Sequence, residues 1–138
     1  MAERKFHAVI TKLNTQCINL VVFVGPEEKD VIGYFKGTLP RDVPLVFEPS
    51  TRIFAALVSN CALFIACDSG PMHLVCALGV RTIGIVVKEF NSDRWMPPPS
   101  LARVVHQTQG HFIRELIEAC YMELENSVKR ERRRVENA

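Results

Sequence analysis

The sequence lacks the features of membrane-spanning and secreted proteins. Its apolar runs are too short to cross a bilayer, and no apolar signal core stands at its N-terminus. The five cysteines are an odd number without a CxxC pair, and three lie inside apolar segments, where cysteine is usually a small buried hydrophobe. These absences predict a protein of the reducing cytoplasm. A location at the inner face of the membrane stays open.

Charge of one sign and metal-binding motifs are also scarce. The formal net charge is +2, and the basic excess gathers in "KRERRR" (129–134), so the main part of the chain gives no reason to expect nucleic acid. Mixed charge at a helix end is more often solvated, although this segment could also attract an anionic membrane surface. No HxxxH or acidic cluster has ligand spacing. We therefore expect no metal and no cofactor.

Length and periodicity predict the domain and its fold. A chain of 138 residues fits one domain, here 1–125, followed by a basic, frayed helical tail at 126–138. Apolar, β-branched runs alternate with segments of helical spacing, and three consecutive prolines mark a loop at 88–100. This alternation predicts a doubly wound, mainly parallel α/β sheet. The expected strands are 18–25, 43–47, 61–67, 81–87 and 102–107, and the expected helices are 6–13, 26–37, 50–59, 70–79 and the segment from 111 onward.

One short polar insert separates two apolar runs. Asp68 ends a predicted strand, and Ser69, Gly70 and Pro71 turn the chain into a predicted helix that carries His73 in its first turn. Ligands of such sheets gather at the carboxyl ends of strands, and a helix N-terminus offers unpaired N–H groups to a phosphate. The insert therefore predicts an anion site. Asp and Ser before a helix are also ordinary caps, and that reading remains an alternative.

The string "DSGPMHLVCALGVRTIGI" (68–85) resembles the signature of the heptosyltransferase-type enzymes of glycosyltransferase family 9. "VVFVGPEE" (21–28) is similar, more weakly, to the family's strand followed by Gly-Pro-x-Glu. The resemblance extends over most of the chain. It implies the C-terminal, Rossmann-like, nucleotide-sugar-binding half of a two-domain GT-B enzyme, without the first strand of that half.

The resemblance also assigns roles to residues. Ser69, Gly70 and Met72 would offer backbone contacts to the donor pyrophosphate, and His73 a side-chain contact. Asp68 would face the sugar or shape the loop. Glu28 would bind the ribose hydroxyls, although acids near a helix start also favour the helix dipole without any ligand. The implied donor-binding residues are Asp68, Ser69, Gly70, Pro71, Met72, His73 and Glu28.

The implied reaction is inverting transfer from an ADP-heptose-like donor to a lipid-linked glycan, in lipopolysaccharide or cell-envelope glycan synthesis. The family's catalytic base belongs to the N-terminal domain, which the resemblance does not cover. We therefore expect no catalytic residue among these 138 and no activity of the chain alone. A nucleotide-binding regulatory module and a non-enzymatic α/β scaffold are the alternatives.

The missing first strand would lie in the middle of the family's sheet. Each unpaired buried backbone group costs roughly 1–3 kcal/mol, so an empty slot would be expensive. We expect direct pairing of "INLVVFV" (18–24) with "CALFIAC" (61–67), which gives one five-stranded sheet. As alternatives, the N-terminal segment "KFHAVITKL" (5–13) or an element of a second copy of the chain could fill the slot, and a homodimer across an exposed edge stays open.

Overall fold

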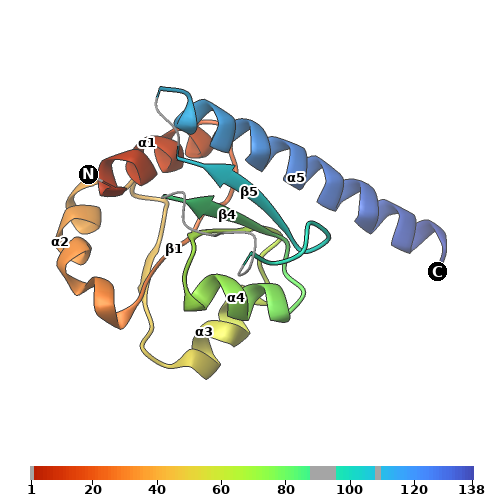
Figure 1. The fold of residues 1–138 in the computed structure, drawn as a ribbon, viewed down its shortest axis with the longest axis horizontal. Helices are drawn as coiled ribbons and strands as arrows, with labels where there is room; N and C mark the ends of the chain where they lie inside the picture. Colours follow the sequence, from red (N-terminus) through yellow and green to blue (C-terminus); the bar gives the residue numbers. More distant parts are fainter. Residues whose placement is uncertain (1, 88–95, 108–109) are drawn as a thin grey trace. The chain divides into compact units, whose positions relative to one another are not determined.

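The computed structural model describes residues 2–87, 96–107 and 110–138 (Figure 1). The chain divides into two compact units, residues 1–54 and 55–138. The predicted domain of residues 1–125 stays a prediction. Most of the predicted loop at 88–100, including Trp95, lies outside the described residues.

Unit 1 is built around a pair of parallel strands. β1 (Val22–Val24) pairs with β2 (Leu45–Phe47), so that Val22 lies opposite Leu45. His7 Nε2 lies 2.8 Å from the Thr38 carbonyl oxygen, a contact that joins the first helix to the second. The buried side chains of this unit include Val9, Leu13, Val24, Phe35 and Val43. Its other elements are α1 (Ala2–Asn14), η1 (Pro26–Glu28), α2 (Lys29–Thr38) and the first turn of α3 (Thr51–Val58).

Unit 2 contains a parallel sheet of three strands in the order β3-β4-β5. All five residues of the central strand β4 are buried. Two helices, α4 and α5, cover the sheet from opposite sides, and the C-terminal turns of α5 extend past the strands (Figure 1). The elements are β3 (Phe64–Cys67), α4 (Gly70–Ala77), β4 (Thr82–Val86), β5 (Ala102–His106) and α5 (Phe112–Glu136).

A close approach between α4 and β4 fixes the start of α4 against the sheet. Met72 is completely buried, and its Sδ would lie 2.8 Å from a Cβ atom added to Gly84. The terminal methyl group of Met96 would lie 3.0 Å from the same atom. A Cβ atom at position 84 would force the Met72 side chain to shift, because the contact would be shorter than 3.0 Å.

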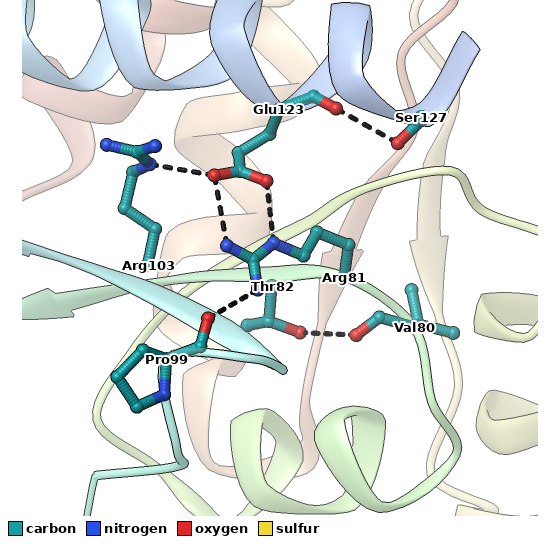
Figure 2. Close-up of polar contacts among 7 residues, drawn as sticks. All are labelled: Val80, Arg81, Thr82, Pro99, Arg103, Glu123 and Ser127. Carbon is teal, nitrogen blue, oxygen red and sulfur yellow. Dashed lines mark hydrogen bonds and ion pairs between the residues drawn. The ribbon is translucent and has the colours of Figure 1, made fainter. Parts of the chain in front are cut away.

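An ion-pair cluster attaches α5 to the amino end of the sheet (Figure 2). Glu123 is 2% exposed, and its carboxylate accepts hydrogen bonds from Arg81 Nε at 2.6 Å and from Arg103 Nε at 2.8 Å. Arg81 also donates to the Pro99 carbonyl oxygen at 2.8 Å. These hydrogen bonds hold the pKa of Glu123 at about 2, although its burial acts in the opposite direction. The buried charge is therefore compensated by two arginines, one directly before β4 and one in β5.

The predicted α/β class is confirmed, and every predicted helix and strand corresponds to an observed element. Their bounds differ, most of all at the first strand, where only three residues of the predicted 18–25 form β1. At the other end, α5 continues without a break through the predicted boundary at 125.

The single five-stranded sheet is wrong. Among the described strands, β1 pairs only with β2, and β3 pairs with β4, so the expected ladder between 18–24 and 61–67 is absent. The expectation of direct pairing rested on the free-energy cost of unpaired backbone groups in long, buried strands. β1 has three residues, two of them only half-buried, and Val21 before it is exposed. A short, partly solvated strand loses much less when one of its edges has no strand beside it.

We expect Glu123→Gln to destabilise the chain by about 3 kcal/mol, near the lower end for a broken buried ion pair because Arg103 is partly exposed. The substitution should also change how the free energy of unfolding depends on pH. The pKa of Glu123 lies below its ordinary value of 4.5, so its contribution is complete above that value and is lost as the pH falls through about 2. Urea unfolding at a series of pH values measures both effects.

Glu118→Gln provides the matched control on the same helix, because Glu118 is 64% exposed and pairs only with Arg114 at 3.8 Å. It should leave the pH dependence unchanged. Parallel pH curves for wild type and Glu123→Gln would contradict the assigned role of Glu123.

Candidate functional site

The candidate site is the turn between β3 and α4, at the carboxyl end of the sheet in unit 2. The strand ends at Cys67, and Ser69 remains extended, with φ −162° and ψ 163°, before α4 begins at Gly70. The Asp68 N–H donates to the Ile85 carbonyl at 3.2 Å and so fastens the turn to β4. Because Pro71 has no N–H, the first helical turn has one fewer donor to satisfy.

Side chains of the turn divide between the core and the surface. Met72 points into the core, whereas Asp68, Gly70, Pro71 and His73 are exposed and Ser69 is half-buried. A Cβ atom added to Gly70 would meet nothing within 4 Å. Among the described residues, nothing therefore blocks a ligand from this position, and a larger side chain there would stand in the ligand's path.

No hydrogen bond from the Gly70 N–H is recorded among the described residues, which leaves this N–H for a ligand. Ser69 makes no side-chain cap hydrogen bond, and the first described backbone bond of the helix runs from the His73 N–H to the Ser69 carbonyl at 3.3 Å. The first N–H groups of a helix have no intrahelical partner, and the aligned peptide dipoles make this end partially positive. An anion at Gly70 would satisfy both features. Met72, by contrast, is fully buried, so its expected backbone contact is not at the surface in this conformation.

Asp68 and His73 form a pair across the turn. His73 Nε2 lies 3.3 Å from Asp68 Oδ1, and the two side chains are 42% and 48% exposed. A proton on Nε2 is therefore donated to the carboxylate, and Nδ1 is left for another partner. The pair brings together the first and last residues of the predicted motif.

Parallel register brings one further titratable side chain to this edge of the sheet. His106 is the last residue of β5, opposite Val86 at the end of β4, and its side chain is exposed. The sequence reading did not single it out. The signal was present, because His106 ends an apolar strand as Asp68 follows one.

Glu28 belongs to unit 1 and lies in η1, directly after β1. Its Oε2 accepts a hydrogen bond from the Gly25 N–H at 3.1 Å, so the carboxylate turns back toward the end of the strand. Glu28 is exposed, and Oε1 has no hydrogen bond recorded among the described residues. The contact with Gly25 is a cap, which agrees with the alternative reading of this acid. It leaves one carboxylate oxygen for a ligand.

Other chemistry finds less support in the described part of the chain. No group of three or more His, Cys, Asp or Glu side chains there could hold a metal ion. None of the helices described combines the length and apolar character that a membrane crossing requires. Burial raises the pKa of the Cys120 thiol to about 12 and also raises that of Cys61, so both thiols are poor nucleophiles at neutral pH.

The Arg81–Glu123–Arg103 cluster was also missed from the sequence. Its signal was a carboxylate in line with the apolar stripe of α5, which includes Phe112, Leu116 and Cys120. The cluster lies at the amino end of the strands, away from the β3–α4 turn. Its role is to hold α5 in place.

Comparisons with known proteins give a family and a solved structure of similar fold. The model of glycosyltransferase family 9 (heptosyltransferase) matches residues 2–112. The chain is also similar to the crystal structure of the glycosyl transferase family 9 from Veillonella parvula DSM 2008, with a TM-score of 0.76 and 19% identity. That match covers 90% of this chain and 41% of the other, so the chain spans less than half the length of that relative. No curated protein matches the chain. Because the family model covers most of its residues, the chain belongs to glycosyltransferase family 9.

Proposed function

We propose that this chain binds the diphosphate of a nucleotide-sugar donor at the β3–α4 turn, as the donor part of a glycosyltransferase. The observation that carries the proposal is the exposed helix start at Gly70, where an open N–H and an unobstructed approach lie beside His73. Family membership supports a sugar nucleotide as the anion.

Each residue of the turn has a proposed part in holding the donor. The Gly70 N–H and the partial positive charge of α4 bind a phosphate oxygen, and Ser69 adds its own backbone or hydroxyl. His73 donates from its side chain. Met72 anchors the turn in the core, and because the whole residue is buried the backbone contact implied for it by the resemblance is not part of this proposal. Pro71 fixes the first helical turn.

In the proposed reaction, an acceptor hydroxyl loses its proton to a base and attacks the anomeric carbon with inversion. The bond from that carbon to the donor phosphate breaks, and its electrons leave on the nucleoside diphosphate. The turn would stabilise the charge that develops on this leaving group. The base is proposed to come from residues other than these 138, so the chain alone would bind a donor without transferring its sugar.

The finer identity of the substrates rests on the resemblance. We propose an ADP-heptose-like donor and a lipid-linked glycan acceptor, used in lipopolysaccharide or cell-envelope synthesis on the cytoplasmic side of the membrane. A peripheral membrane contact through the basic segment 129–134 would fit such an acceptor. The two alternatives, a nucleotide-binding regulatory module and a scaffold, are separated by binding and by transfer assays.

ADP should bind the wild-type chain and shift the amide resonances of residues 68–74 more than those elsewhere in unit 2. Gly70→Val should weaken this binding by roughly tenfold or more, because a branched side chain would occupy the approach to the N–H group. Titration calorimetry gives the affinity, and amide NMR spectra give the location.

Gly37→Val is the matched control. Gly37 lies in α2, and a Cβ atom added there also meets nothing within 4 Å. This variant should bind ADP as wild type does. Failure of the wild-type chain to bind ADP would favour the scaffold, whereas equal binding by both variants would place the ligand elsewhere.

We also propose Glu28 as a ligand of the ribose hydroxyls. Glu28→Gln keeps an oxygen that can accept the Gly25 N–H, but it removes the charge that strengthens hydrogen bonds to a diol. ADP binding should weaken by about fivefold to tenfold, while inorganic pyrophosphate should bind as before. Glu27→Gln, in the same exposed turn, is the control and should change neither ligand's affinity. An equal loss for ADP and pyrophosphate would contradict a role at the ribose.

A further inference from the structure

Asp68 presents an electrostatic problem for a site that binds an anion. Its carboxylate immediately precedes the turn that the proposed diphosphate would contact, and it is about half exposed. A fixed negative charge beside a phosphate opposes binding unless another group offsets it.

His73 is the basic side chain nearest to Asp68 in the sequence. Between Leu63 and Val80, Asp68 is the only carboxylate and His73 the only basic side chain. The two meet at 3.3 Å through His73 Nε2 and Asp68 Oδ1. Among the described residues, His106 also lies at this end of the sheet, two strands away at the end of β5.

We propose that Asp68 is a positioning residue, which holds the His73 imidazole through Nε2, and that protonated His73 in turn cancels the charge of Asp68 for a bound diphosphate. The inference rests on the proposed function and specifies how the same site can bind an anion although it contains the carboxylate of Asp68. With Nε2 held by the carboxylate, Nδ1–H of the imidazolium is the donor that remains for a phosphate oxygen. Asp68 then acts through His73 and not as a direct ligand.

Two exchanges at position 68 separate positioning from charge. Asp68→Asn keeps an oxygen acceptor for Nε2 and removes the negative charge, whereas Asp68→Leu has similar bulk and no acceptor. The side-chain nitrogen resonances of neutral His73 should report one dominant tautomer, protonated at Nε2, in wild type and in Asp68→Asn. Asp68→Leu should give a mixture of the two tautomers. Identical imidazole spectra in all three proteins would overturn the positioning role.

A double-mutant cycle with ADP tests the charge balance. His73→Ala should weaken ADP binding by roughly tenfold or more, because it removes a charged donor and exposes the ligand to Asp68. The affinity of Asp68→Asn for ADP should stay within about threefold of that of wild type. The substitution removes the repulsion between Asp68 and the ligand, but it also removes the negative charge that holds His73. Introducing Asp68→Asn into the His73→Ala protein should recover a large part of the lost affinity.

The outcomes distinguish this inference from the proposed function. If wild type fails to bind ADP, both are wrong. If wild type binds but Asp68→Asn weakens binding equally with and without His73, the donor site stands and the pairing role falls. Both side chains are exposed, so thermal unfolding should show all variants folded like wild type.

Discussion

The packing of Met72 against Gly84 is the constraint on which the rest of the candidate site depends. The side chain of Met72 is fully buried, and a Cβ atom at position 84 would lie 2.8 Å from its sulfur. This contact with β4 therefore fixes the position of the first turn of α4, which directly follows the end of β3. Met72 is buried, whereas Gly70 and His73 are exposed. A helix start held in this way is preorganised for an anion at the Gly70 N–H, and little conformational entropy would be lost when one binds.

The two ends of the sheet in unit 2 have different physical characters. At the amino end, Glu123 is buried and satisfied by Arg81 and Arg103, so its charge is compensated and α5 is fixed (Figure 2). At the carboxyl end, Asp68 and His73 are exposed, and their side chains lie 3.3 Å apart. The N–H of Gly70, at the helix start beside them, has no hydrogen bond recorded among the described residues. The stabilising cluster and the proposed binding site therefore lie at opposite ends of the same three strands.

The sequence predicted the order of helices and strands because each apolar run was bounded by a clear turn signal, as at Ser69, Gly70 and Pro71. It also brought Asp68 and His73 into one candidate site. It could not predict that β1 would have only three residues, because strand length depends on pairing and burial across the sheet and not on the run of β-branched residues alone. The burial of Met72 and the partners of Glu123 were hidden for the same reason: both depend on residues distant in sequence.

The most direct test of the account is a crystal structure of this chain with ADP. The account predicts a phosphate oxygen within hydrogen-bond distance of the Gly70 N–H, with the His73 side chain on the same diphosphate and Asp68 still bonded to His73. Met72 should remain buried against Gly84. A diphosphate bound away from residues 68–73, or a turn that must leave the core to reach it, would contradict the claim that this helix start is a preformed donor site.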